Sequence, residues 1–470
     1  MVRGDEQDLE VRMFQTLFYI PERLWGLPVF GAGILLAVCA LAAVIVVGYQ
    51  FRKHGWNGET AGYAALFVVL GAVIYFVLPN LCVPITRHGV PLPGTPRGLP
   101  IRGYGTMLLL AVLSSVGLAM YRAKRWGIDP DAIFELALWG IVPGIVGARA
   151  FHVIEYWSVD YAPILHEQGI VPAMLAVINV PKGGLVVYGS LIGGIAGIAY
   201  YIFRRRLPLL PVLDLITPSL VLGLAIGRIG CFLNGCCFGG ACELPWAVRF
   251  PPESPAFVHQ VEHGMVPIQG LMLRADPKRP DGLPVVSAVV PGSPAEEAGV
   301  KPGEHLVEVN GVRLDDPRLD VPPIVVAVHA LGYSSTPPAT VRIATVEGDT
   351  YQWAGGPAVP ERSQPIHPTQ LYSSINAFVL FFFVLAYEPF RKRDGELFAV
   401  LMTLYPVTRF ILEIIRTDEP GIVAGLSISQ TVSVLILCGV ACLWIVLRRR
   451  PIGITYPRRD DRATVESREP

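Results

Sequence analysis

The sequence has little charge and no excess of either sign. Charged residues make up 16% of its 470 residues, against about 25% in ordinary soluble proteins. The 38 basic and 38 acidic residues cancel, so no net field attracts nucleic acid. Hydrophobic residues instead reach 52%, and the mean hydropathy is +0.49. These values exclude a disordered chain, a collagen-like chain and a small disulfide scaffold.

The first 28 residues lack the basic segment and apolar core of a cleavable signal peptide, so none is expected. Later in the chain, nine apolar stretches approach the length of about 20 residues that a helix needs to span a bilayer. We expect spanning helices at residues 29–48, 61–79, 104–121, 133–154, 184–203, 209–227, 371–388, 396–415 and 427–447. The sequence therefore predicts a polytopic α-helical membrane protein.

Basic clusters alternate along the chain with the predicted spans. They follow the first, third, fifth, seventh and ninth spans, at Arg52-Lys53, Arg122 with Lys124 and Arg125, Arg204-Arg205-Arg206, Arg391-Lys392-Arg393 and Arg448-Arg449-Arg450. Because short loops rich in lysine and arginine stay in the cytoplasm, this pattern predicts an outer N-terminus and a cytoplasmic C-terminus. Residues 155–182, 228–370 and 417–421 then lie on the outer side.

The longest outer segment has room for a soluble domain. Leu283–Trp353 alternates between apolar and polar residues between turn signals, as strands do. Residues 292–304 predict a short helix and a turn, and Leu306–Val309 followed by Asn310-Gly311 predicts a strand entering a tight hairpin. This stretch resembles a PDZ domain, with Glu304 where Asp is usual. The polar tail after Pro451 is expected to be disordered.

Neither the cysteines nor the histidines form a familiar metal motif. Cys231, Cys236, Cys237 and Cys242 crowd together, but they lack the two separated knuckles of a structural zinc site. A disulfide on the outer face or packing at the end of a span is favoured instead. His259-Gln260-Val261-Glu262-His263 lacks the H-E-x-x-H order of a zinc protease, so we expect these histidines on the surface.

Several charged residues lie inside the predicted spans or at their ends. Among them are Arg149, Arg228, Arg409, Glu413 and Arg416. A charge inside a span costs at least a few kcal/mol in a bilayer, which favours a functional interpretation. The last three share one helix face, so Glu413 could simply neutralise the two arginines beside it. That explanation leaves the other arginines unaccounted for. Arginines converging at one depth favour a phosphate-bearing headgroup, which a guanidinium binds in bidentate fashion.

Two glycine-rich stretches allow different interpretations. The glycines between residues 183 and 194 let helices approach closely. Those between Gly227 and Gly240 flank Arg228 and Asn234, where a turn at a helix end can present backbone N–H groups to an anion.

The charged and glycine-rich residues belong to a series of motifs along the chain. They are Tyr104-Gly105, Gly144–Arg149, the group Gly227, Arg228, Gly230, Phe232, Asn234 and Gly239, then Pro245–Pro251, His367–Tyr372, the trio Arg409, Glu413 and Arg416, and Ser427–Gln430. In order and spacing the chain from Ile101 onward resembles the bacterial prolipoprotein diacylglyceryl transferase family, apart from a long insertion between Pro251 and His367. Three residues depart from the family pattern: Cys231 replaces Asn, Cys236 replaces Glu, and Tyr188 replaces His.

The resemblance implies an activity and a site. Such enzymes, in the bacterial cytoplasmic membrane, move the diacylglyceryl group of phosphatidylglycerol onto the lipobox cysteine of a preprolipoprotein, forming a thioether and releasing glycerol phosphate. No metal or other cofactor is required. The resemblance assigns catalysis to Arg228, Arg409, Tyr188 and Tyr104, and substrate binding to Arg149, Asn234, Gly239, Glu413, Arg416, His367 and Gln370. The separate resemblance of Leu283–Trp353 to a PDZ domain implies a peptide partner for that stretch.

Because of these departures, the sequence does not decide which residue removes the proton from the thiol. The histidine replaced by Tyr188 has been regarded as a candidate base, and a tyrosine hydroxyl, with an ordinary pKa of about 10, is a poor base at neutral pH. Two other function classes also remain: a non-catalytic lipid-binding or scaffolding relative, and a PDZ-bearing intramembrane protease. The absent H-E-x-x-H disfavours the protease.

The expected organisation has five parts. Residues 1–100 form an N-terminal extension with two spanning helices, and residues 101–250 form the first part of a seven-helix transferase core. Residues 251–366 form an outer insert with a PDZ-like domain at about 283–353. Residues 367–450 hold the last three helices, and 451–470 form the tail.

Overall fold

The computed structural model describes residues 15–84, 86–87, 90–91, 97–178, 184, 186–251, 254–276, 282–315, 323–332, 338–356, 362–416 and 425–456. The chain divides into two compact units. The first comprises residues 1–106, 230–236 and 241–367, and the second comprises residues 107–229, 237–240 and 368–470. The predicted outer turn at 417–421 lies outside the described residues.

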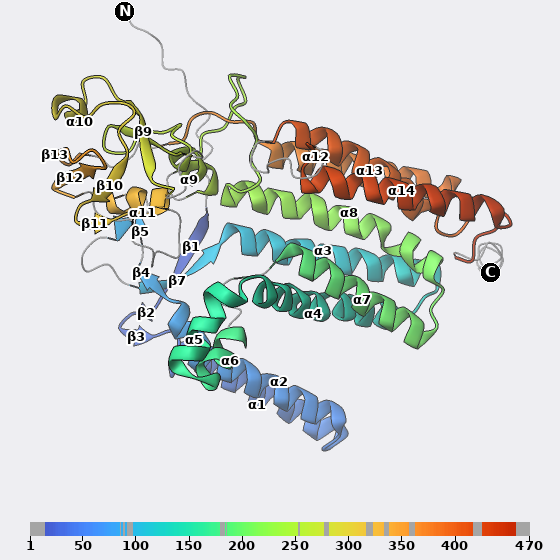
Figure 1. Ribbon diagram of the computed structural model, residues 1–470. Coiled ribbons are helices and arrows are strands. Elements are labelled where there is room, and N and C mark those ends of the chain that lie inside the picture. Colours follow the sequence, from blue (N-terminus) through green and yellow to red (C-terminus); the bar gives the residue numbers. More distant parts are fainter. Residues whose placement is uncertain are drawn as a thin grey trace, which may run out of the picture. The chain divides into compact units, whose positions relative to one another are not determined.

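Nine helices among the described residues are long and apolar enough to cross a membrane, which confirms a polytopic helical membrane protein (Figure 1). They are α1 (Ile34–His54), α2 (Gly58–Ala72, continued by shorter helical turns to Leu81), α3 (Gly103–Trp126), α4 (Pro130–Glu155), α7 (Val187–Arg205), α8 (Leu209–Asn234), α12 (Thr369–Tyr387, continued to Phe390), α13 (Glu396–Ile414) and α14 (Ile428–Arg449). Each matches one predicted span. The largest difference is at α8, which continues to Asn234, so Gly227–Gly230 are helical and do not form the expected glycine-rich turn.

In the second unit, α4 and α7 pack through glycine. A Cβ atom added at Gly147 would collide with the carbonyl oxygen of Gly189, and one at Gly193 would collide with that of Pro143. Such close approach is possible only where side chains are absent, as in other membrane helix pairs. The glycines of the fifth predicted span therefore serve helix packing.

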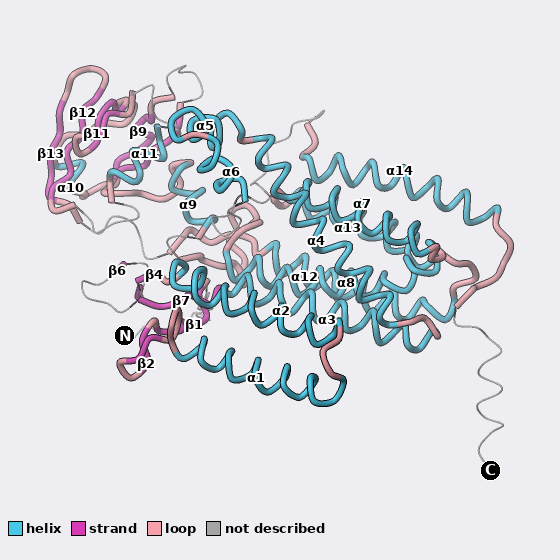
Figure 2. The backbone as a smooth tube through the Cα atoms, turned by 90° about the horizontal axis from the view of Figure 1, so that it is seen from below, coloured by secondary structure: helices cyan, strands magenta, loops and turns pink. Residues whose placement is uncertain are grey.

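Beyond α4, a short helical region leads to α7. It contains a π-helical turn (Trp157–Tyr161), α5 (Ala162–Gln168) and α6 (Ile170–Ile178). At the other side of the unit, α13 contacts both α12 and α14, and Figure 2 shows these helices running side by side.

A buried ionic network joins α8 to the start of α13 in the second unit. Asp214 of α8 accepts hydrogen bonds from the backbone N–H groups of Gly395 (2.8 Å) and Phe398 (3.0 Å), at the start of α13. Arg391 pairs with Asp214 at 3.2 Å and lies over the Trp126 ring. Arg391 also donates to the carbonyl oxygen of Tyr456, so residues 451–456 contact the helices. This corrects the expected start of a disordered tail at residue 451; residues 457–470 lie outside the described residues.

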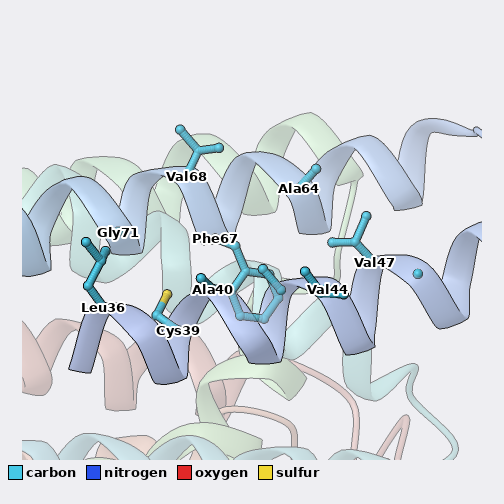
Figure 3. A pocket seen from close by; sticks show the side chains of 11 residues that line it. Leu36, Cys39, Ala40, Val44, Val47, Ala64, Phe67, Val68 and Gly71 are labelled. Carbon is cyan, nitrogen blue, oxygen red and sulfur yellow. The ribbon is translucent and has the colours of Figure 1, made fainter. Parts of the chain in front are cut away.

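The first unit contains the N-terminal hairpin of α1 and α2. Beside it, β1 (Thr16–Pro21) pairs with β7 (Arg97–Arg102), which also pairs with β4 (Val83–Pro84). An apolar cavity of about 420 Å³ lies between the two helices, and Figure 3 shows Cys39 and Phe67 among its lining side chains. Two short ladders, β2 (Arg23–Leu24) with β3 (Leu27–Pro28) and β5 (Thr86–Arg87) with β6 (Val90–Pro91), complete this region.

The insert of the first unit is a compact β-rich module. A ladder of β8 (Leu271–Ala275) and β9 (Pro284–Val289) accompanies a sheet in the order β11 (Val312–Arg313), β10 (Leu306–Val309), β12 (Thr340–Thr345) and β13 (Thr350–Ala354). Asn310 and Gly311 adopt positive φ in the β10–β11 hairpin, as that dipeptide predicts. The remaining elements are α9 (Pro255–Glu262), α10 (Pro294–Glu297) and α11 (Pro323–Ala330).

The hydrophobic core of this module begins earlier than the sequence suggested. It includes Phe257 and Val261 of α9 together with Leu273 of β8, all of them buried. The module therefore starts near Pro255, rather than at residue 283.

Candidate functional site

The centre of the candidate site is a buried carboxylate at the end of α13. Glu413 Oε2 lies 2.7 Å from Nη1 of Arg409 and 3.3 Å from Nη1 of Arg416. The Glu413 side chain is only 2% exposed, and those of Arg409 and Arg416 are 13% and 6% exposed. Arg409 and Glu413 lie one helical turn apart on α13, and Arg416 follows just after the end of that helix. One carboxylate thus fixes two guanidinium groups.

The start of α14 completes this arrangement. Ser427 and Gln430 form a reciprocal capping box, which satisfies N–H groups at the start of the helix. The Ser427 hydroxyl also donates to Glu413 Oε1 at 3.2 Å, and Arg409 Nη2 donates to the Ser429 hydroxyl at 3.0 Å. The Ser427–Gln430 motif therefore joins the end of α13 to the start of α14.

The second half of the signature lies against the same helix end. Gly239 and Arg416 form an antiparallel bridge, and the Gly240 N–H donates to the Ile415 carbonyl at 3.0 Å. Thr369, at the start of α12, donates to the Cys237 carbonyl at 2.7 Å. The next residue, Gln370, is fully buried. Residues 237–240 are thereby held between α12 and α13.

The cluster carries an excess of positive charge. Arg228 of α8 and Arg416 both interact electrostatically with Arg409. Three guanidinium groups with one carboxylate leave a net charge of two, in a place with little solvent. Such a place favours an anion, and a phosphate has the oxygens that a guanidinium can bind in bidentate fashion.

Arg149 makes a different set of contacts, near the end of α4. Its guanidinium donates to the carbonyls of Val177 (2.8 Å) and Ala176 (2.7 Å) in α6, and to the carbonyl of Gly184 (3.1 Å). Tyr161 lies beneath it, with the guanidinium carbon 5.7 Å from the ring centroid. Arg149 thus links the end of α4 to α6 and to Gly184.

These groups all lie near the same end of the second unit. In Figure 1, α4, α8 and α13 finish at the end where α7, α12 and α14 begin. Tyr188 belongs to the first turn of α7 and is 41% exposed. The structure therefore brings Arg228, Arg409, Glu413, Arg416 and Gly239 into one cluster, with Arg149 and Tyr188 at the α4–α7 pair.

Comparison with known proteins identifies the family. A family model described as prolipoprotein diacylglyceryl transferase matches residues 95–446. The chain belongs to this family. A phosphatidylglycerol–prolipoprotein diacylglyceryl transferase of Rhodopirellula baltica is 35% identical over 472 residues, covering 95% of this chain and 91% of the relative. One from Clostridium tetani is 27% identical over 346 residues, covering 73% of this chain and 92% of the relative.

The family match leaves out the α1–α2 hairpin but runs through the insert. It extends from residue 95 to residue 446. The Rhodopirellula baltica match extends over nearly the whole chain, so it takes in most of that hairpin and of the insert. The chain is thus a multi-pass membrane transferase in which the seven later helices carry the family's motifs.

Three predicted residues of the transferase core belong to the first unit. Tyr104 is the second residue of α3 and is 42% exposed. Asn234 is the last residue of α8, and its carbonyl accepts a hydrogen bond from Gln15 at 3.2 Å. His367 follows the segment in which Ile366 bridges to Ala241 and Val248. The roles of these three residues stay predictions.

None of the eight cysteines forms a disulfide in the structure, so the disulfide, one of the two arrangements expected for the cluster, is absent. Cys231 lies within α8, and the Cys236 thiol is 3.7 Å from its carbonyl oxygen. This arrangement agrees with the other explanation, packing at the end of a span.

Sequence reasoning missed His152 as part of the site region. It lies on α4 one turn after Arg149, and its side chain is 15% exposed. The spacing of three residues places both side chains on one face of the helix. The sequence could have indicated His152, because it follows an arginine inside a predicted span by three residues.

Proposed function

We propose that this transferase binds the phosphate of phosphatidylglycerol with Arg409, Arg416 and Arg228, and transfers its diacylglyceryl group to the cysteine thiol of a prolipoprotein. The observation that carries the proposal is the net positive charge of the buried cluster around Glu413. Because Glu413 holds two of the guanidiniums in place, they need little reorganisation when an anion binds. Preorganised donors of this kind stabilise charge that develops in a transition state.

The chemistry follows from the substrates. The thiol, with an ordinary pKa near 8.5, loses its proton. The thiolate attacks the glyceryl carbon that carries the phosphate ester, and a carbon–sulfur bond forms while the carbon–oxygen bond breaks. The leaving glycerol phosphate gains negative charge, which the three arginines stabilise. We propose that Tyr188, Gly239 and Gln370 position the substrates around this cluster. Tyr104, Asn234 and His367 are also proposed to act on the substrates.

The transferase is proposed to lie in the bacterial cytoplasmic membrane with its N-terminus outside and its C-terminus in the cytoplasm. The basic clusters after the first, third, fifth, seventh and ninth spans support this orientation. The ends of α4, α8 and α13 then face outward. A lipid can enter that region from the side, and a lipoprotein precursor reaches it from the membrane with its signal helix.

The insert is proposed to bind an extended segment of an exported protein, as PDZ domains do by adding a peptide to a sheet edge. A bound precursor would be concentrated near the catalytic site. Its compact core and the hairpin at Asn310-Gly311 support a folded module of this size. A module that only covers the outer mouth of the site is the competing explanation.

The activity is tested with the purified full-length chain in phosphatidylglycerol vesicles. We expect labelled diacylglyceryl to appear on a lipobox peptide as a thioether, and no labelling of a peptide with serine in place of the cysteine. A folded, membrane-inserted protein that binds the lipid but transfers nothing would instead identify a non-catalytic lipid-binding relative. Cleavage of the peptide without transfer would identify a protease.

A further inference from the structure

The transfer needs a group that removes the thiol proton, and neither Glu413 nor Tyr188 suits this task. Glu413 is held by two arginines and a serine, so its oxygens are already engaged by positive charge. Tyr188 carries a hydroxyl, which is a poor base at neutral pH. Histidine is the side chain whose ordinary pKa fits proton transfer near pH 7.

The second unit contains two histidines, His152 and His166. His166 belongs to α5, whereas His152 belongs to the spanning helix α4, one turn after Arg149. A Cβ atom added at Gly184 would lie 2.6 Å from Nε2 of His152 and 2.7 Å from Nη1 of Arg149. The two side chains therefore converge on one point beside Gly184, where any larger residue would collide with them.

The ring of His152 is held in a defined orientation. Its Nδ1 lies 3.1 Å from the Tyr161 hydroxyl, and Tyr161 is only 3% exposed. Its face stacks on Tyr156, with ring centroids 4.7 Å apart. If Nδ1 carries the proton and donates it to Tyr161, the lone pair of Nε2 faces Gly184. A base oriented by a third group is the arrangement that activates nucleophiles in other transfer enzymes.

The position of His152 also relates it to α7. The Val186 N–H donates to the Ala148 carbonyl at 3.2 Å, and a Cβ at Gly189 would lie 2.5 Å from the Cβ of Phe151, the neighbour of His152. The start of α7, including Tyr188, is thus fixed against the turn of α4 that carries His152.

We propose that His152 is the general base that removes the proton from the lipobox thiol. This proposal rests on the transferase activity proposed above. The thiol proton passes to Nε2, and the thiolate then forms the carbon–sulfur bond as the carbon–oxygen bond breaks. Glycerol phosphate leaves with the bonding electron pair, and the imidazolium afterwards returns its proton to solvent.

Two charged side chains lie close to His152. On α4, Arg149 converges with the imidazole on Gly184; on the π-helical turn, Oδ2 of Asp160 lies 3.9 Å from Nε2. Tyr156 stacks on the imidazole and the Tyr161 hydroxyl lies 3.1 Å from Nδ1, while α6 carries no titratable side chain. Protonated His152 cannot accept a proton, so activity is expected to fall as the pH is lowered.

The test compares His152→Gln with wild type on two lipobox peptides, one with cysteine and one with selenocysteine, whose selenol is already ionised at neutral pH. His166→Gln is the matched control. A general base contributes about 100-fold or more, so we expect His152→Gln to lose at least 100-fold in kcat with cysteine, together with the acidic limb of the pH–rate profile. With selenocysteine the variant should come within about tenfold of wild type.

Loss of activity to the same extent with both peptides would overturn the proposal, since it would mean that His152 acts only by positioning the segment around Tyr161. Cysteine transfer by His152→Gln within threefold of wild type would overturn it as well. If wild type itself transfers neither peptide, the transferase function fails, and that outcome is distinct from either of these.

Discussion

Arg409 and Glu413 form an ion pair of 2.7 Å one helical turn apart, in a part of α13 where the carboxylate is only 2% exposed. A buried carboxylate that holds two guanidiniums in place is the feature from which the phosphate site is inferred. The pair does not need to add net stability to serve this purpose, because the desolvation of buried charges commonly offsets their attraction.

Replacing Glu413 by Gln is expected to destabilise the protein. The substitution removes the carboxylate that pairs with both guanidinium groups, and breaking a buried pair in this way costs about 3–5 kcal/mol. Thermal unfolding in detergent should show a clear drop in Tm. Glu135→Gln is the control, because its partner Arg205 is 58% exposed and surface pairs contribute about 1 kcal/mol or less. Equal Tm values for the two variants would argue against a Glu413-centred cluster.

Tyr188→Phe is expected to lower transfer without moving the alkaline limb of the pH–rate profile, because the hydroxyl positions substrate and is not the base. Tyr188→His should be tolerated. Tyr121→Phe, at an exposed tyrosine of α3, serves as the control. A shift of the alkaline limb in Tyr188→Phe would instead make tyrosinate the base and contradict this assignment.

Removing the insert is expected to spare the chemistry. Phe250 and Ser363 are paired through backbone and hydroxyl contacts of 2.8 Å, so a short Gly/Ser linker can replace residues 255–362. Transfer to a short lipobox peptide should stay within several-fold of wild type, whereas full-length precursors should show a raised KM. Replacing only residues 283–353 is a useful contrast, since it would expose Phe257 and Val261, which belong to the same core.

Complete loss of transfer to the short peptide, in an inserted and folded 255–362 variant, would place the insert in the catalytic site. An unchanged KM for full-length precursors would favour a module that only covers the site.

Hydropathy predicted the nine helices because it depends only on the local composition of each span. The basic clusters supported the same number, since they follow every second span. The Asn310-Gly311 hairpin was predictable because its backbone conformation is local. The continuation of α8 to Asn234 could not be predicted from the sequence. Glycine locally favours a turn, and only packing within the fold keeps Gly227–Gly230 helical. The hydrogen-bond partners of Arg149 could not be predicted either. They are backbone carbonyls about 30 residues away in the chain, and no residue pattern marks them. The start of the module at α9 depends on similarly distant contacts.

The central claim is that the arginines at the ends of α8 and α13 bind the lipid phosphate, and kcat of Arg228→Ala for transfer from labelled phosphatidylglycerol tests it most directly. Charged hydrogen bonds contribute about 1.5–3 kcal/mol each, and each 1.36 kcal/mol corresponds to about tenfold in rate. The account therefore predicts a loss of at least tenfold, partial rescue by Arg228→Lys, which lacks the bidentate fork, and no loss in the surface control Arg205→Ala. Transfer at the wild-type rate by a folded, inserted Arg228→Ala protein would contradict it.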